Sequence, residues 1–341
     1  MLDIDAVYSE IGDLGPQQVR YAVAFLLFNA YASWHMLQFS FVGYAIKFEC
    51  YTADQDTPYY NVCPANAASK CQKITFSNVE AETTIVSEWD LVCDREWLAG
   101  ATMSAFMAGV MFGAPLLGSA SDAIGRRKTA FGCLAGIVFL NGFSAVAPTY
   151  ALYVALKFCV GFFQGGFIIA MFVLCNELIG ASKRGHVSNG LQCAFAVGIM
   201  LYSFSAYHCR HWRSLTLLVT LVGSPLILYY FYLPESPRWL QSKGRTKEAV
   251  AVVKKIAAGN GRKFSVGGGA AMDEEASVGG GNGSVRKIEN GDSVVDLLRQ
   301  RALLPSTMIQ MYSWFVNGVA YYGLTIAASS AEKGEEGDRY M

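Results

Sequence analysis

The feature that most constrains this chain is the way its apolar residues are grouped. They fill windows of about 20 residues that carry almost no charge, and the charged side chains lie between the windows. A helix needs about 20 apolar residues to cross roughly 30 Å of hydrocarbon, whereas a helix of a soluble domain repeats its apolar residues with a period of 3.6. The chain is only 16% charged, against about 25% in soluble domains. The pattern predicts an all-α integral membrane protein.

Seven windows are long enough to span a membrane. The spans are Tyr21–Ile46, Leu98–Ala120, Phe131–Ala147, Ala151–Leu178, Val187–Tyr207, Leu215–Leu233 and Leu304–Ala328. They predict five regions: an N-terminal segment (1–20), a six-span bundle (21–233) with a large loop (47–97), a second long loop (234–303), a seventh span (304–328) and a polar tail (329–341).

Orientation follows from the side on which Lys and Arg gather, because short cytoplasmic loops carry an excess of them. They gather at Arg126–Lys128, at Lys183–Arg184 and in the loop 234–303, which share one side. The opposite side holds the acidic loop 47–97 and the short loop Arg210–Arg213, whose arginines run against the trend. The three basic loops predict a multi-pass protein of the plasma membrane with its N-terminus in the cytoplasm and the loop 47–97 outside.

The outer loop contains four of the nine cysteines: Cys50, Cys63, Cys71 and Cys93. An even number of cysteines in an oxidising compartment predicts two disulfides, and three pairings are open. Free thiols are the alternative. The inner loop begins with Thr246–Gly259, where Ala249, Val250, Val253 and Ile256 recur at helical spacing among lysines. This spacing predicts an amphipathic helix on the cytoplasmic side.

The loop after the second span reads Gly118-Ser-Ala-Ser-Asp122-Ala-Ile-Gly125-Arg126-Arg127-Lys128. Gly118 would let a neighbouring helix approach closely, and Gly125 would permit a tight turn between two spans. Asp122 would face the positive N-terminus of a helix. Arg126 would pair with a carboxylate at the same membrane face. A basic inner anchor is the simpler alternative, but it explains neither Asp122 nor Gly125.

This loop resembles the signature of the major facilitator superfamily, and three further segments narrow the resemblance. They are Ser87-Glu-Trp-Asp-Leu-Val-Cys93, Pro234-Glu-Ser-Pro-Arg-Trp-Leu240 and Met311-Tyr-Ser-Trp-Phe-Val-Asn-Gly-Val-Ala-Tyr-Tyr-Gly-Leu324. Together they are similar to the organic cation, anion and carnitine transporters. The resemblance implies two six-helix bundles that rock around a central site near the midplane and so transport a small organic ion by alternating access. This chain would contribute the first bundle and the first helix of the second.

The resemblance also implies a charged latch at the inner ends of the spans. In the family pattern Glu177, Arg184 and Arg126 interact, and Glu235 and Arg238 form a second charged set. Such ion pairs would form in the outward-facing state and break when the bundles part. The alternative is a set of solvated loop charges that contribute little.

Two spans of the first bundle carry ionisable groups away from their ends. Lys157 occupies a position where the family pattern has Arg, and an intramembrane charge is functional by default. The alternative is that its side chain extends to the outer surface. Gln164, two turns further along, is a candidate polar contact for the substrate. His35 would either face the cavity and titrate or be a hydrogen-bonded packing residue.

In the seventh span, Trp314, Asn317 and Tyr321 share one helix face. Aromatic rings on that face would hold an organic cation by cation–π attraction, or they would form a packing stripe. Some members of the family carry an acid where Asn317 stands, so its absence weakens a preference for cations from this helix. Lys157 slightly favours anions or zwitterions as substrates, but the sequence predicts neither the charge of the substrate nor the coupling ion.

Nothing in the sequence predicts covalent chemistry. There is no nucleophile–base pair, phosphate-cradling loop or metal-ligand cluster, and the net charge of zero predicts no nucleic-acid partner. We therefore expect a non-enzyme without cofactor or metal, whose partners are the lipid bilayer and a small organic ion. Oligomeric state is not predicted.

The second bundle is missing beyond its first helix, and a six-plus-one set of helices cannot close a cavity between two bundles. The sequence thus suggests a truncated chain that does not transport alone. A non-transporting regulatory partner of a full-length carrier is one alternative. A seven-helix receptor is another, although the basic loops place the N-terminus on the wrong side for it, and the tripeptide Asp338-Arg339-Tyr340 follows the seventh span rather than the third.

Overall fold

The computed structural model describes residues 3–44, 46–52, 55–61, 63, 71, 73–76, 83–262, 264 and 304–320. The chain divides into two units, Met1–Asp273 and Glu274–Met341. Each unit is described by itself. In the second unit residues 304–320 form one helix, which covers most of the predicted seventh span.

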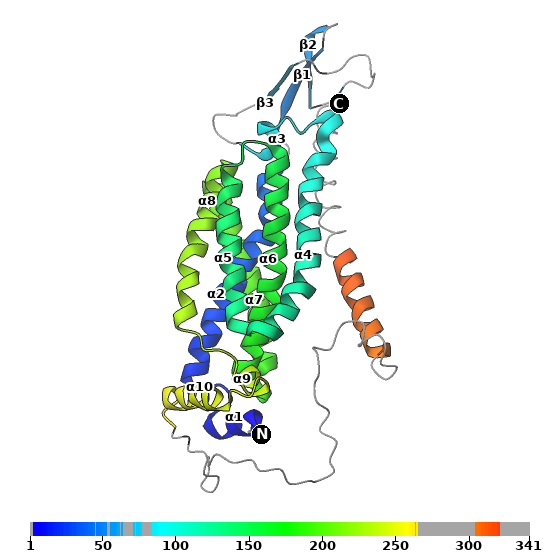
Figure 1. The fold of residues 1–341 in the computed structure, drawn as a ribbon. Helices are drawn as coiled ribbons and strands as arrows, with labels where there is room; N and C mark the ends of the chain where they lie inside the picture. The colour runs from blue at the N-terminus through cyan, green and yellow to red at the C-terminus, as the bar shows by residue number, and fades with distance from the viewer. Residues whose placement is uncertain are drawn as a thin grey trace. The chain divides into compact units, whose positions relative to one another are not determined.

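Six long helical segments of the first unit form a bundle (Figure 1). They are α2 (Pro16–Val42), α4 (Glu96–Ile124), α5 (Arg126–Ala145), α6 (Tyr150–Leu178), α7 (Arg184–His208) and α8 (Trp212–Gly223) with its 3₁₀ extension η3 (Ser224–Phe231). At one end of the bundle lies a small sheet, and at the other end lie α1 (Ile4–Ile11), α9 (Pro237–Ser242) and α10 (Thr246–Gly259). We call these the sheet end and the basic end.

Five helical stretches of the described residues are long and apolar enough to cross a membrane: Cys93–Ile124, Arg126–Ala145, Tyr150–Leu178, Ala181–His208 and Trp212–Phe231. These stretches confirm the all-α membrane fold. Helix α2 has 27 residues and is about 40 Å long, and Asn29 and His35 interrupt its apolar sequence. The division of the chain into seven spans and their loops stays a prediction.

The boundaries of the helices differ from the predicted spans where the backbone requires it. The predicted span Leu215–Leu233 is an α-helix only as far as Gly223 and continues as the 3₁₀ helix η3. Pro225 has no N–H and therefore cannot donate the hydrogen bond that would continue the α-helix. At the other extreme, α10 covers the residues that the sequence predicts, with Ala249, Val253 and Ile256 buried.

A single glycine separates α4 from α5, as the motif in this loop predicts. Gly125 has a φ of 120°, which side chains with a Cβ rarely adopt. A Cβ at Gly125 would also lie 2.5 Å from Oε2 of Glu235. The turn therefore needs glycine for its backbone conformation and for the approach of the Glu235 carboxylate.

Helices α4 and α6 approach each other closely at two pairs of glycines rather than at Gly118. A Cβ on Gly113 would lie 1.8 Å from the carbonyl oxygen of Phe162, and one on Gly161 would lie 2.1 Å from that of Phe106. A Cβ on Gly118 would meet its nearest neighbour, Ile169, at an ordinary 3.7 Å. Small residues four apart let membrane helices touch backbone to backbone. Gly109 and Gly113 face Gly161 and Gly165 in this way.

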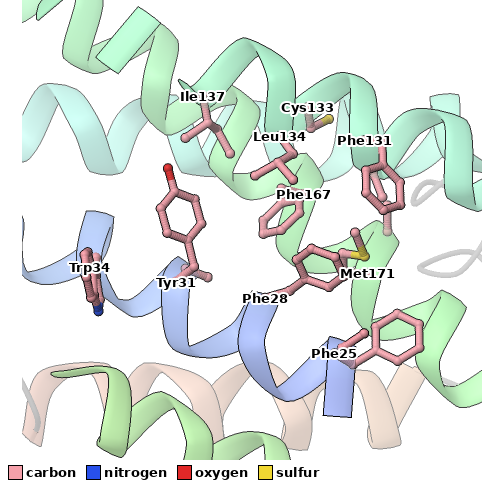
Figure 2. Close-up of a cluster of buried hydrophobic side chains, with 14 of the residues drawn as sticks. Phe25, Phe28, Tyr31, Trp34, Phe131, Cys133, Leu134, Ile137, Phe167 and Met171 are labelled. Carbon is pink, nitrogen blue, oxygen red and sulfur yellow. The ribbon is translucent and has the colours of Figure 1, made fainter. Parts of the chain in front are cut away.

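Aromatic side chains fill the space between α2, α5 and α6 (Figure 2). The ring of Phe28 lies edge-on to the rings of Phe131, Phe167 and Tyr229, with centroids 5.7, 6.2 and 5.6 Å away. Edge-to-face pairs contribute about 0.5–1.5 kcal/mol each beyond the area they bury. This cluster fixes the position of α2, which carries two of the residues discussed below.

The loop at the sheet end contains a three-stranded antiparallel sheet that the sequence did not lead us to expect. Its strands β1 (Phe48–Thr52), β2 (Gln55–Tyr60) and β3 (Lys73–Phe76) lie in the order β2-β1-β3. Disulfides join Cys50 to Cys71 and Cys63 to Cys93, with Cα–Cα distances of 5.4 and 5.6 Å. Two disulfides are thus present, in one of the three possible pairings. Cys93 starts η1 (Cys93–Arg95), which leads directly into α4.

The arginine that ran against the charge trend of the loops has a local structural partner. Arg213 forms an ion pair with Glu88 at the end of the short helix α3 (Ile85–Glu88), and it donates to the carbonyl oxygens of Ala145 and Ala147 at 2.6 and 3.0 Å. The indole nitrogen of Trp212 donates to the same carboxylate at 2.6 Å. Arg213 therefore ties α8 to the end of α5, which accounts for a basic residue on this side.

Candidate functional site: a charged cluster at the basic end and a buried lysine

Six charged side chains meet at the basic end, and we call them the basic-end cluster: Asp5, Asp122, Arg126, Glu177, Arg184 and Arg238. Arg126, the first residue of α5, binds Glu177 near the end of α6 at 3.2 Å. It also binds Asp122, one turn earlier, at 2.8 Å. The predicted contact between Arg126 and Glu177 is present, and it joins two residues that are 51 positions apart in sequence.

The remaining arginines of the cluster have a partner that the sequence did not indicate. Arg184 does not pair with Glu177. It donates to the carbonyl oxygens of Asn176 and Ile179 at 2.8 and 3.1 Å, and to Asp5 of α1 at 2.8 Å. Arg238 binds the same oxygen of Asp5. One carboxylate of the N-terminal helix therefore joins Arg184 and Arg238, which the sequence predicts in separate charged sets.

The second set differs from its prediction at Glu235 as well, because Glu235 does not pair with Arg238. Its Oε1 accepts from the backbone N–H groups of Arg127 and Ser236, both at 3.0 Å. The carboxylate thus sits at the N-terminus of α5, where unpaired backbone N–H groups and the helix dipole favour a negative charge. Its role here is to cap a helix.

Helix α1 carries Asp5 to the cluster, and its own sequence explains how. Ile4, Val7, Tyr8 and Ile11 recur on one face, and all four are buried. Asp3 caps the helix by accepting from the N–H groups of residues 5 and 6 at 3.1 and 3.2 Å. The 3.6-residue period of this short segment is the signal that would have predicted the helix.

The electrostatics of the cluster follow from the two arginines. The hydrogen bond from Arg238 holds the pKa of the Asp5 carboxyl below its usual value, and the charge of Arg184 acts in the same direction. Burial raises the pKa of the Tyr8 hydroxyl, which donates to the carbonyl oxygen of Glu177 at 3.2 Å. Asp5 is therefore a carboxylate, and Tyr8 a neutral phenol, at neutral pH.

Inside the membrane-spanning bundle, Lys157 of α6 is held by neutral amides. Its side-chain nitrogen donates to Oε1 of Gln38 on α2 at 2.7 Å and to Oδ1 of Asn141 on α5 at 2.9 Å. The residue is only 5% exposed. Its side chain therefore does not extend to the outer surface, which removes the alternative that the sequence left open. We call Gln38, Asn141, Lys157 and Thr216 the lysine centre.

Helix α8 holds the two amides in place. Asn141 donates through Nδ2 to the carbonyl oxygen of Thr216 and to the hydroxyl of Thr220, both at 3.1 Å. Gln38 donates through Nε2 to Oγ1 of Thr216 at 3.2 Å. Each amide thus points its oxygen at the lysine because its nitrogen is engaged on the other side. The lysine centre joins four helices.

His35 and Lys157 line one small cavity between α2, α4 and α6. His35 is 3% exposed, and no described residue is hydrogen bonded to either of its ring nitrogens. Its ring lies edge-on to Tyr31 at 5.0 Å. The described residues therefore do not provide the hydrogen bonds of a packing role, which was one of the two alternatives for His35.

The other predicted substrate contacts lie elsewhere. Gln164 is fully buried and donates to the carbonyl oxygen of Ala32 on α2 at 3.0 Å, so it ties α6 to α2 and does not line the cavity of His35. Trp314 and Asn317 lie on the helix of the second unit, where Trp314 is 71% exposed. Tyr321 lies outside the described residues.

Comparisons with known proteins place this architecture in a class. Among solved structures, the proton:xylose symporter XylE of the major facilitator superfamily matches with a TM-score of 0.52 at 16% identity, over 69% of this chain and 48% of that one. An inward-open structure of the xylose transporter XylE from E. coli matches with a TM-score of 0.50 at 15% identity, over 71% and 55%. At these identities the likeness concerns the fold alone. This chain is a multi-pass membrane protein with the major facilitator fold.

The profile of the sugar (and other) transporter family matches residues 24–331, and the chain belongs to this family. Several curated relatives are similar to the chain as well. An organic cation transporter protein of Drosophila melanogaster is 29% identical over 94% of this chain and 64% of its own length. A solute carrier family 22 member 15-like protein of Xenopus laevis is 31% identical over 96% and 63%. The human organic cation/carnitine transporter 2 is 33% identical over 72% and 43%.

These relatives confirm the resemblance to organic-ion transporters of the major facilitator superfamily, and they do not favour the receptor or the regulatory partner. The chain spans somewhat less than two thirds of the length of the first curated relatives that it matches.

Proposed function

We propose that this chain forms the N-terminal bundle of a carrier that moves small organic ions across a membrane by alternating access. The observation that carries the proposal is Lys157, a cation held deep inside a bundle whose helices otherwise bear charge only near their ends. Burying an ionisable side chain in a membrane span is costly, so such residues usually serve an ion or substrate path. The names of the relatives, which include cation and carnitine transporters, support organic ions as the substrate class.

The basic-end cluster suits the role of a latch in this proposal. Its ion pairs form two groups, one connecting α4, α5 and α6 and the other connecting α1, α7 and α9, and each paired side chain stays partly accessible to water. Partly hydrated ion pairs cost little to exchange for water, which allows them to form in one state and part in another. Arg126 and Glu177, which are 13% and 18% exposed, would contribute most to the closed state.

The proposal includes an orientation. The basic end would face the cytoplasm and the disulfide-bonded sheet would face the outside of the plasma membrane. Two observations support this arrangement: Lys and Arg gather at the basic end, and disulfides persist in an oxidising compartment. Labelling of an epitope at the N-terminus in intact and permeabilised cells tests it, and labelling of intact cells would contradict it.

The function is tested by uptake. The longest reading frame that contains this sequence would be isolated from transcripts and expressed at a cell surface. Uptake of labelled tetraethylammonium, benzoate and carnitine would then be measured as examples of a cation, an anion and a zwitterion. We expect uptake of at least one compound above that of cells carrying empty vector. A protein that reaches the surface and carries none of the three classes would overturn the proposal.

A further inference from the structure

We propose that the cavity beside Lys157 and His35 binds a single small anionic group, either the carboxylate of an organic substrate or an inorganic anion such as chloride. This inference rests on the proposed function, because it assigns a ligand chemistry to the same bundle. It does not depend on the sign of the whole substrate, since a zwitterion also carries an anionic group.

The first argument is the charge balance of the bundle. None of the ion pairs formed by the described residues includes Lys157, whose two acceptors are neutral amides. In the long helices of the described chain, Asp and Glu occur only near helix ends, at Glu96, Asp122 and Glu177. A buried cation without a counter-charge costs several kcal/mol, and an anion beside it recovers part of that cost.

The second argument is that the lysine is held in a fixed position. The amide oxygens of Gln38 and Asn141 occupy two of the three ammonium hydrogens, and each amide is fixed in turn by a threonine of α8. The ring of Tyr153 lies 5.4 Å from the lysine nitrogen. The third ammonium hydrogen therefore remains for a ligand, and the network that positions it does not have to rearrange to bind one.

The third argument comes from the other residues that line the cavity. His35 is more than nine-tenths buried, and a neutral imidazole always carries one N–H donor, which no described residue accepts. Phe39, Met103 and Phe106 form the apolar part of the wall, and Gln38, Thr102 and Tyr153 form its polar part. The Gln38 amide and the Thr102 hydroxyl are engaged by Lys157, Thr216 and Tyr150. The lining residues supply a positive charge and an N–H donor but no carboxylate, which favours an anionic ligand over a cation. The cavity has a volume of about 20 Å³, which suits one group of the size of a water molecule.

The test uses the purified 341-residue chain in nanodiscs and follows its thermal unfolding. Sodium chloride and sodium acetate are compared with sodium methanesulfonate at equal ionic strength, because the sulfonate head group is larger than a chloride ion or a carboxylate group. We expect chloride, acetate or both to raise the Tm by a few degrees, because a ligand that binds only the folded state stabilises it. A response to chloride alone identifies an inorganic-anion site, and a response to acetate alone identifies a carboxylate site.

Variants separate this site from general salt effects. The response should disappear in Lys157→Gln and persist in the matched control Lys255→Gln, which removes an exposed lysine of α10. If Lys157→Gln does not fold, Gln38→Glu decides instead. That variant places a carboxylate where Oε1 of Gln38 now lies, 2.7 Å from the lysine nitrogen, and should abolish the response by supplying the missing counter-charge.

Equal Tm values in the three salts for the unmodified chain would overturn the inference, as would an anion response that survives in Lys157→Gln or Gln38→Glu. Either result would leave the proposed function standing, because Lys157 can lie on the path of the substrate without binding an anion in this cavity.

Discussion

The basic-end cluster and the lysine centre differ in how their charged side chains are compensated. At the basic end, four arginine–carboxylate pairs link six side chains that are 13–70% exposed. In the lysine centre a single cation, 5% exposed, is surrounded by neutral amides and hydroxyls. The first region pairs its charges among themselves and stays in contact with water. The second holds one charge without a counter-charge and away from water.

The difference matches what each region would have to do in a carrier. Ion pairs that part during a cycle are best placed where water replaces the lost partner at small cost. A charge that meets a ligand is best placed where water does not compete, because its interaction is then stronger. Four predictions test this difference, ordered from the buried lysine centre to Asp122, the most exposed side chain of the cluster.

The largest effect is expected at Asn141, which is fully buried. Asn141→Leu removes one of two acceptors of the buried ammonium and both bonds to α8. We expect a loss of about 2–4 kcal/mol in stability, because the charge is then poorly compensated. Thermal unfolding in nanodiscs measures it. Asn176→Leu, at the partly exposed end of α6, serves as control and should cost less than about 1 kcal/mol. Equal losses would remove the distinction between the two regions.

A smaller effect is expected for the best-buried ion pair of the cluster. In a double-mutant cycle of Arg126→Gln and Glu177→Gln, we expect a coupling free energy of about 1 kcal/mol, because both side chains are mostly shielded. The same cycle for Arg245 and Glu248, an exposed pair at the N-terminus of α10, should give about 0.3 kcal/mol. A coupling no larger than that of the control pair would mean that Arg126 and Glu177 do not hold α5 to α6.

The next effect is a pH dependence that Asp5 confers. Its pKa is lowered in the folded state by Arg238 and Arg184, so its pairs stabilise the protein fully above the ordinary pKa of about 4 and are lost as the pH falls through the lowered value. We expect Asp5→Asn to reduce stability at pH 7 by less than about 1 kcal/mol, since the group is 42% exposed.

The difference between Asp5→Asn and the unmodified chain should shrink as the pH falls below about 4. Unfolding measured between pH 7 and pH 3 gives the comparison. Glu10→Gln, which neutralises an exposed acid of the same helix, is the control for the loss of one negative charge. A constant difference for Asp5→Asn would show that its carboxylate is not stabilised by the arginines.

The smallest effect is expected at Asp122, whose side chain is 70% exposed and pairs with Arg126 one turn away. Exposed pairs at this spacing contribute about 0.3–0.5 kcal/mol. Asp122→Asn should therefore shift the Tm only slightly, and raising the salt concentration should remove even that shift because salt screens exposed charges. A shift as large as that of Glu177→Gln would place Asp122 among the principal contacts of the cluster.

The membrane helices could be predicted from the sequence because a bilayer imposes length and composition on each span. Gly125 was predictable for a related reason, since a one-residue turn needs a conformation that glycine adopts. Gly118 was not the contact that its motif suggested. Which glycine meets a neighbouring backbone depends on the crossing of α4 and α6, and a single sequence does not specify that crossing.

The sheet and Asp5 were missed for different physical reasons. The strands β1–β3 are too short to show a long alternation of apolar and polar residues, which is the pattern that predicts a strand. Two disulfides hold the loop that contains them. Asp5 lies on a helix of eight residues whose apolar spacing was visible, but its two arginine partners are 179 and 233 residues away in sequence. Contacts of that range depend on tertiary packing, which local patterns do not encode.

The lysine centre was predictable in part. A lysine in an apolar window could be recognised as a candidate from the sequence. Its amide partners Gln38 on α2 and Asn141 on α5 could not, because the pattern around each of them indicates only a membrane span. The sequence could not decide between a buried lysine and one that extends to the surface. The hydrogen bonds on α2, α5 and α8 decide it.

The central claim is that Lys157 lies on the path of the substrate, and uptake by the long reading frame tests it most directly. For the compound carried best, we predict that Lys157→Gln lowers uptake per surface-expressed molecule about tenfold or more, an effect of roughly 1.4 kcal/mol, while Lys157→Arg retains part of it and Lys255→Gln leaves it unchanged. Undiminished uptake by Lys157→Gln would contradict the account.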